Sequence, residues 1–256
     1  MDVTSELTIV IPVRIDFKER KENLDAVLYS LLNTTNAYII ILEADTEQRY
    51  SCKEQNKRLN HIFVYDKNPI FHRTVYLNKL LNLSTTNIVG VWDTDIILKA
   101  SQIRDAANAV KNGMTLCYPY DGRFLFFNSE QSDRVKKDVL SFFNYSNVDK
   151  IEAPSMGRPS VGGAFVVNKQ RYLKAGGENE NFYGWGPEDA ERLKRMEILE
   201  ESVGRTQGPL FHMYHPRGIN STFGGGERDI HNIKEFLKIC EMDIKCLSKY
   251  TQTWNN

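Results

Sequence analysis

The chain has 256 residues, 41% of them hydrophobic, which is enough to bury a substantial core in one large domain without disulfides. Lys plus Arg equals Asp plus Glu at 33 each, so no overall field would steer the protein to nucleic acid or to an anionic membrane. The four cysteines have neither CxxC spacing nor the density of a disulfide scaffold, which is typical of a reducing compartment.

The first apolar run begins at residue 7 and lacks the basic and long apolar regions of a signal peptide. No run of about 18 apolar residues occurs in the sequence. We therefore expect a cytoplasmic protein, either free or attached peripherally to the inner membrane. A chain trimmed of a membrane anchor would show the same pattern.

Short β-branched runs alternate with helical patterns, which predicts βαβ units and a mainly parallel sheet in a single α/β domain. Apolar residues recur at helical spacing near the C-terminus, which predicts an amphipathic helix at residues 229–250. The other expected elements are strands at residues 8–11, 38–42, 61–65 and 88–92 and helices at residues 23–32, 74–83 and 102–111.

Polar residues stand where three predicted strands end, and in open α/β sheets the ligand binds beyond the carboxyl ends of the strands. The first strand leads into Pro12 and Arg14, the second into Asp45, and the fourth into Asp93 and Asp95. Carboxylates that converge with an arginine suit Mg²⁺ or Mn²⁺ together with phosphate. The pattern favours a metal-bridged diphosphate, although a DxD alone also occurs at solvated turns.

Three other chemistries of α/β proteins lack their motifs. The sequence contains no GxxxxGK[ST] loop, no GxGxxG after the first strand and no GxSxG. These absences argue against a P-loop NTPase, a dinucleotide-dependent dehydrogenase and an α/β-hydrolase, respectively.

The most informative segment begins at Gly162 and Gly163 and ends with Trp185, Glu188 and Asp189. Paired glycines let a ligand approach the backbone, and an indole beside carboxylates is a common way to stack on and hydrogen-bond a sugar. A plainer interpretation is a glycine hairpin turn followed by acids that begin a helix. Both can hold, because a helix N-terminus is a rigid mount for an aspartate that acts as general base.

This segment resembles the C-terminal half of the β-1,4-galactosyltransferase family, where a GG strand, an NGF-like turn and a GWGGED motif follow in the same order. Upstream, PVR at residues 12–14, FHR at 71–73 with LN at 77–78, and DTD at 93–95 resemble that family's PFR, FNRxxxLN and DVD segments. The resemblance extends over residues 7–215, and the layout also resembles bacterial family 2 glycosyltransferases. It implies a single GT-A domain, with a nucleotide-binding half at residues 1–100 and an acceptor and catalytic half at 101–215.

The resemblance further implies a UDP-sugar donor and a role for each matching residue. Phe71 would pack on the uracil, Arg14 and Arg73 would face the nucleotide, and Trp185 would lie against the sugar and diphosphate. Asp93 would contact the UDP. The full donor-binding set that we expect is Pro12, Arg14, Asp45, Phe71, Arg73, Asp93, Gly162, Gly163 and Trp185.

On the acceptor side, the resemblance implies that Glu188 hydrogen-bonds the sugars and that Asp189 is the catalytic base. Two positions depart from the family motif: Pro187 replaces a glycine and Ala190 replaces an acid. These departures leave acceptor recognition open. Ser160 stands where the galactosyltransferases carry a bulky tyrosine near the sugar's C2 substituent, which implies that a 2-acetamido donor is accepted as well as UDP-Gal.

The same resemblance implies that Asp95 binds a divalent metal. The family has a Met and a His three residues apart as metal ligands at this place in the chain, so His215 is the preferred histidine ligand and His212 the next. Two imidazoles and a carboxylate suit Mn²⁺, with Mg²⁺ as the alternative. Residues 216–228 would form a flexible lid that excludes water. Arg217 and Arg228 would meet phosphate there, unless the loop is simply solvated.

Together these features predict an inverting glycosyltransferase that moves Gal or GalNAc from a UDP-sugar to a hydroxyl of a glycan, polysaccharide or lipid-linked saccharide, with no nucleic-acid partner. One alternative is a catalytically silent module that binds nucleotide sugars or glycans. Another is a retaining transferase or a sugar nucleotidyltransferase. The silent module is disfavoured because the acids and both histidines are retained.

Overall fold

The computed structural model describes residues 2–52, 56–144 and 151–254. Within them, seven strands form the main sheet in the order β3-β2-β1-β4-β8-β6-β9, and β5, β10 and β7 form a smaller sheet. The predicted α/β fold with a mainly parallel, mixed sheet is confirmed. The strands are β1 Leu7–Val13, β2 Tyr38–Asp45, β3 Leu59–Tyr65, β4 Ile88–Trp92, β5 Ile96–Ile97, β6 Leu116–Tyr118, β7 Phe124–Phe126, β8 Ala164–Asn168, β9 Val203–Arg205 and β10 Leu210–His212.

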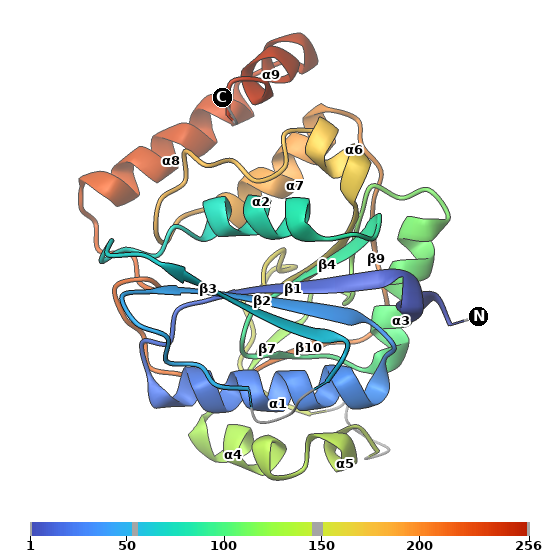
Figure 1. The fold of residues 1–256 in the computed structure, drawn as a ribbon. Coiled ribbons are helices and arrows are strands. Elements are labelled where there is room, and N and C mark those ends of the chain that lie inside the picture. Colours follow the sequence, from blue (N-terminus) through green and yellow to red (C-terminus); the bar gives the residue numbers. More distant parts are fainter. Residues whose placement is uncertain (1, 53–55, 145–150, 255–256) are drawn as a thin grey trace.

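Helices cover both faces of the main sheet (Figure 1). On one side α1 lies against the sheet with α4 and α5 beyond it, and on the other side lie α2, α6 and α7, with α8 and α9 outermost. The helices are η1 Val3–Glu6, α1 Lys18–Thr34, α2 Arg73–Leu83, α3 Ala100–Lys111, α4 Ser129–Lys137, α5 Val139–Asn144, α6 Lys169–Lys174, α7 Glu188–Ile198, α8 Glu227–Cys240 and α9 Ile244–Thr251.

The central strands are apolar on both faces, as expected of parallel strands covered by helices. Every residue of β1 and β4 is buried, and β1 pairs in parallel with β2 on one side and with β4 on the other. The seven strands and helices expected before residue 112 are all present; β4 matches its predicted range, and the others extend theirs by up to five residues at either end. Within the described residues, no helix is long and apolar enough to cross a membrane.

The C-terminal segment corrects one expectation, because it forms two helices rather than one at residues 229–250. α8 ends at Cys240, and α9 begins after Asp243. The Asp243 carboxylate accepts a hydrogen bond from the backbone N–H of Cys246 (2.7 Å), which caps the second helix. The helical periodicity of the apolar residues continues across this break, so the pattern alone does not reveal it.

Two pairings between distant segments position the site. β8 runs antiparallel to β4, and the backbone N–H of Asp93 donates to the carbonyl of Gly163 (2.9 Å), so the glycine pair lies beside the DxD segment. Gly163 has a positive φ of 82°, which favours glycine, and it leads directly into β8. In the smaller sheet β10 pairs with β5, which places His212 opposite Ile96.

Candidate active site

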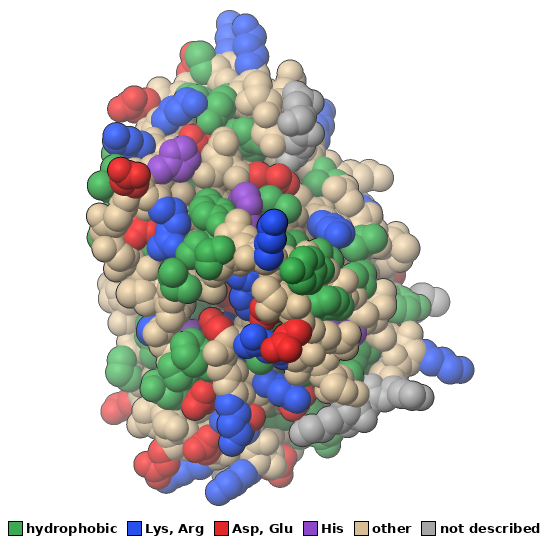
Figure 2. Space-filling view, turned by 60° about the vertical axis from the view of Figure 1, so that its left-hand side comes forward, with side chains coloured by type: hydrophobic (Ala, Val, Ile, Leu, Met, Phe, Trp, Pro, Cys, Tyr) green, Lys and Arg blue, Asp and Glu red, His purple; other side chains and the backbone are tan. Residues whose placement is uncertain are grey.

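A cleft of about 650 Å³ lies at the carboxyl ends of the central strands. Charged side chains of both signs lie among hydrophobic ones on this side of the molecule (Figure 2). Asp45 is the exception among the predicted site residues, since it does not line the cleft. All the other predicted site residues line the cleft: Pro12, Arg14, Phe71, Arg73, Asp93, Asp95, Gly162, Gly163, Trp185, Glu188, Asp189, His212 and His215.

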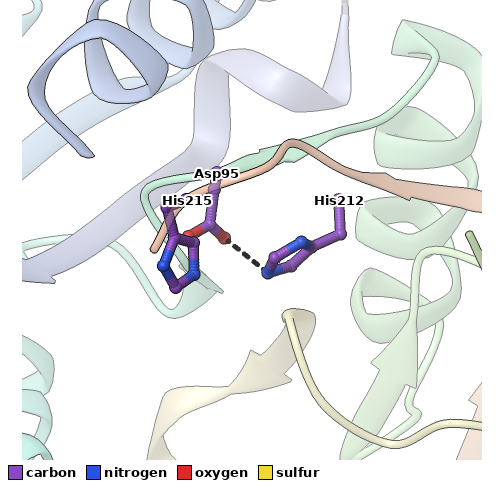
Figure 3. A group of neighbouring side chains, drawn as sticks. All are labelled: Asp95, His212 and His215. Atoms are coloured by element: carbon purple, nitrogen blue, oxygen red, sulfur yellow. Dashed lines mark ion pairs between the residues drawn. The ribbon is translucent and has the colours of Figure 1, made fainter. Parts of the chain in front are cut away.

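One side of the cleft, the histidine wall, consists of Asp95, His212 and His215. Their potential ligand atoms all lie within 4.8 Å of one another. Nε2 of His212 lies 3.5 Å from one Asp95 carboxylate oxygen, and Nε2 of His215 lies 3.3 Å from the other. Figure 3 shows both imidazoles beside the carboxylate. The pairing of β5 with β10 causes this convergence, because the Met213 N–H donates to the Asp95 carbonyl (2.8 Å).

The donor set of the histidine wall fits a divalent transition metal. Nδ1 of His215 lies 2.7 Å from the carbonyl of Pro216, which can only accept a hydrogen bond from it, so Nε2 is the ring nitrogen that faces Asp95. Burial lowers the pKa of His212 to about 4, so its imidazole is neutral near pH 7. Burial alone would raise the pKa of Asp95, but the two imidazoles and Arg20 outweigh it and lower that pKa.

Arg20 also lines the cleft, and sequence reasoning missed it. It is mostly buried, donates to Asp16 (2.7 Å) and to the Thr94 hydroxyl (3.2 Å), and lies 3.6 Å from the Asp95 carboxylate. Its only signal in the sequence is the acid four residues earlier, a spacing that also occurs in ordinary surface pairs on helices. Arg20 therefore places a positive charge against the DxD carboxylates, where a diphosphate is expected.

A second part of the cleft lining, the carboxylate wall, consists of Glu188 and Asp189 in the first turn of α7, where the helix dipole favours acids. A Cβ at Gly162 would lie only 2.5 Å from Oδ2 of Asp189, so a larger residue there would displace the Asp189 carboxylate. The other oxygen, Oδ1, accepts a hydrogen bond from Nη1 of Arg192 (2.7 Å). The proposed base is thus held between a glycine backbone and a buried arginine.

Glu188 has an unusual electrostatic environment. Burial, and then the neighbouring Asp189 charge, raise its pKa to about 8, against the opposing effect of Arg73. Its Oε2 is buried, and no described protein group hydrogen-bonds it. At neutral pH the carboxyl is therefore protonated and can donate a hydrogen bond to a sugar oxygen.

The arginines expected to face the nucleotide differ in what they are free to contact. Arg14 donates to the carbonyls of Ala44 (2.8 Å) and Asn68 (2.7 Å) and to Asp66 (2.8 Å), so its donors are engaged within the protein. Nη2 of Arg73 donates to Asp93 (2.6 Å), whereas its Nη1 is buried with no protein partner among the described residues. Arg73 is thus better placed than Arg14 to bind a ligand.

Phe71 and Asp45, which were both expected to bind the donor, lie in different surroundings. The Phe71 ring lines the cleft and stacks on Tyr76, with centroids 5.2 Å apart. Asp45 lies away from the cleft lining, where its carboxylate accepts from the Thr46 N–H (2.7 Å) and pairs with Arg49 (3.6 Å). A nucleotide contact by Asp45 has no support in the geometry.

Residues 216–228, which were predicted to form a lid, fold against the cleft. Asn220 accepts a hydrogen bond from the Phe71 N–H (2.9 Å), and the Phe223 ring packs edge-on against Trp185, with centroids 5.6 Å apart. Arg217 lines the cleft, whereas Arg228 pairs with Asp229 (3.0 Å) and does not line it. Of the two arginines predicted to meet phosphate, Arg217 is therefore the one that lines the cleft. The closing of this segment as a lid stays a prediction.

Comparisons with known proteins identify the fold. Residues 144–216 match the family model described as the N-terminal domain of galactosyltransferase. Glucosyl-3-phosphoglycerate synthase from Mycobacterium tuberculosis, solved with Mn²⁺, UDP and phosphoglyceric acid, is similar with a TM-score of 0.54 at 12% identity, over 94% of this chain and 82% of that chain. The chain has a GT-A glycosyltransferase fold. Curated protein sequences give no match to it.

A second similar structure is itself a β-1,4-galactosyltransferase. A mutant β-1,4-galactosyltransferase 7 from Drosophila, in complex with manganese, UDP-Gal and xylobiose, is similar with a TM-score of 0.53 at 13% identity, over 88% of this chain and 78% of that chain. The family match includes the glycine pair, the carboxylate wall and both histidines. The predicted resemblance to GT-A glycosyltransferases and to the galactosyltransferase family is confirmed.

Proposed function

We propose that this chain is an inverting glycosyltransferase that moves galactose or N-acetylgalactosamine from a UDP-sugar to a hydroxyl of a saccharide acceptor. The observation that carries the proposal is that one cleft is lined by both a metal-ligand triad and a helix-mounted carboxylate pair. The similar GT-A structures that contain Mn²⁺ with UDP or UDP-Gal support it.

The residues of the carboxylate wall account for the chemistry at the acceptor. Asp189 accepts the proton of the acceptor hydroxyl as its oxygen attacks the anomeric carbon from the face opposite UDP. The new C–O bond forms as the bond to the diphosphate breaks, the electron pair leaves with UDP, and the configuration inverts. Protonated Glu188 donates a hydrogen bond to a sugar oxygen and so orients the reacting sugars.

The residues of the histidine wall hold the leaving group. Asp95, His212 and His215 would hold Mn²⁺ or Mg²⁺, which when bound supplies Lewis-acid stabilisation of the developing diphosphate charge. Arg20 and Arg73 add preorganised positive charge near the two DxD carboxylates. Trp185, which is 38% exposed in the cleft lining, offers an indole face to the sugar.

A screen of UDP-sugars tests the proposal. UDP release is measured for UDP-Gal, UDP-GalNAc, UDP-Glc and UDP-GlcNAc with Mn²⁺, in water alone and with a panel of mono- and disaccharides. We expect slow hydrolysis of UDP-Gal or UDP-GalNAc and faster release with at least one acceptor. Tight UDP binding with no release from any donor would instead indicate the silent binding module.

A further inference from the structure

Behind the carboxylate wall lies a chain of buried charges that the proposed chemistry does not use directly. Arg192, one turn after Asp189 on α7, has a side chain with 0% exposure. Its Nη1 donates to Oδ1 of Asp189 (2.7 Å), and its Nη2 donates to Oε2 of Glu178 (2.9 Å). Its Nε lies 3.0 Å from the Tyr172 hydroxyl. The guanidinium therefore links the proposed base to two buried side chains from outside α7.

The anchor of this chain is itself rigid. Glu178 is 2% exposed and follows the glycine pair at residues 176–177, and its backbone N–H and carbonyl both hydrogen-bond the Asn78 side-chain amide (2.8 and 2.9 Å). The Arg192 guanidinium also lies over the Phe165 ring of β8, 4.1 Å from its centroid. Packing and charge together leave Arg192 one orientation, and a rigid donor fixes the carboxylate that it binds.

We propose that Arg192 is a positioning residue for Asp189. It occupies Oδ1 and thereby directs Oδ2 toward the cleft beside Gly162, so that the base meets the acceptor hydroxyl without reorganisation. This inference rests on the proposed function, because it assigns a role to the group that holds the proposed base. Sequence reasoning did not find it, since an acid and an arginine three residues apart on a helix are also common at the surface.

The chain offers a matched control one turn further along α7. Arg195 also has 0% exposure, and it pairs with the buried Glu191 (2.8 Å) and donates to the carbonyls of Ala175 and Gly177 (2.6 Å each). It has the same type of environment as Arg192 but makes no hydrogen bond or ion pair with Asp189. A purely structural role predicts similar consequences for the two arginines, whereas a positioning role separates them.

The experiment compares Arg192→Lys and Arg192→Met with Arg195→Lys and Arg195→Met, using Mn²⁺-dependent UDP release from the better of UDP-Gal and UDP-GalNAc. We expect Arg192→Met to lower kcat by about 10²-fold, the size of a misplaced catalytic group, with KM for the donor within threefold of wild type. Arg192→Lys should recover part of kcat. Both Arg195 variants should lower the melting temperature and leave kcat within about threefold of wild type.

Equal kcat for folded Arg192→Met and Arg195→Met would overturn the inference, as would a loss confined to KM. If the methionine variants do not fold, Glu178→Gln and Glu191→Gln repeat the comparison, because each removes one partner charge with little change in shape. We then expect a severalfold fall in kcat for Glu178→Gln alone, and equal values would overturn the inference. A wild-type protein that releases no UDP would instead refute the proposed function, and this inference with it.

Discussion

The two walls of the cleft are built in opposite ways. The histidine wall joins one carboxylate and two imidazoles from segments far apart in the sequence. Sheet pairing between β5 and β10 brings them together. The carboxylate wall places two adjacent acids on one helical turn, where the Asp189 charge disfavours ionisation of Glu188, and the buried Arg192 lies behind Asp189. The comparison teaches that the proposed leaving-group site depends on long-range topology, whereas the proposed acceptor site depends on local helix geometry and its buried anchor.

Removing divalent metal should have the largest effect, and it acts on the histidine wall alone. In excess EDTA we expect turnover to fall by at least about 10³-fold, because metal Lewis acidity contributes several kcal/mol at about 1.36 kcal/mol per tenfold change. Added Mn²⁺ should restore activity better than Ca²⁺, which prefers a cage of oxygen ligands. Circular dichroism with EDTA is the control for folding. Full turnover in excess EDTA would remove the metal role from the histidine wall.

Asp189→Asn is the corresponding test of the carboxylate wall. We expect kcat to fall by about 10²-fold or more, because a positioned base contributes roughly 10²–10⁴. The dissociation constant for UDP with Mn²⁺, measured by calorimetry, should stay near the wild-type value, since the histidine wall is unchanged. Asp243→Asn is a matched control, because asparagine caps a helix as well as aspartate. Normal turnover of Asp189→Asn would assign the base to another group.

Ser160 tests where the donor sugar binds relative to the two walls. It is 5% exposed, lines the cleft, and its hydroxyl accepts a hydrogen bond from the Gly162 N–H (3.3 Å). We expect UDP-GalNAc to be used at least as well as UDP-Gal, and Ser160→Tyr to shift kcat/KM toward UDP-Gal by tens-fold, within the range of about 1–3 kcal/mol for a misplaced small group.

The control for this position is Ser160→Ala, which removes the hydroxyl without adding bulk and should leave the donor preference unchanged. Steady-state kinetics with both donors gives the answer for the three proteins. A strong native preference for UDP-Gal that Ser160→Tyr does not move would show that this position does not contact the C2 substituent.

We expect the smallest effect on activity from the ionisation of Glu188 at alkaline pH. Its pKa is raised to about 8, so the carboxyl is protonated and donates below that pH, and it ionises beside Asp189 as the pH rises through 8. We expect kcat/KM to fall about tenfold per pH unit above 8, as for a single essential protonated group. Glu188→Gln, which keeps a donor and cannot ionise, should lack that fall. The same alkaline fall in Glu188→Gln would assign the titration to a different group.

The sequence was sufficient for the elements of the first 111 residues that it named and for the local part of the site. The strand expected at residues 88–92 and the helix expected to begin at the acids after Trp185 are both present, so Asp93 follows β4 and Asp189 lies in the first turn of α7. The contact of Gly163 with Asp93 depends on the antiparallel pairing of β8, which no local pattern specifies. Only the family resemblance connected these segments before the structure.

The buried arginines and the break between α8 and α9 were not predictable from local patterns. Arg20 and Arg192 have acidic partners at helical spacing, and the same spacing occurs in solvated pairs, so their burial follows only from tertiary packing. Asp45 shows the converse, because it stands at a strand end like Asp93 but turns its carboxylate to Thr46 and Arg49 instead of the cleft. Chain position at a strand end indicates a neighbourhood, while side-chain partners decide the role.

The anomeric configuration of the product tests the two-wall account most directly. With an α-linked UDP-sugar and an acceptor that accelerates UDP release, the product linkage is determined by the one-bond and vicinal couplings of the anomeric proton in NMR spectra. The account predicts a β-linked product, because Asp189 activates the acceptor on the face opposite the diphosphate. An α-linked product would show that the acceptor attacks from the same side as the leaving group and would contradict the assignment of the two walls.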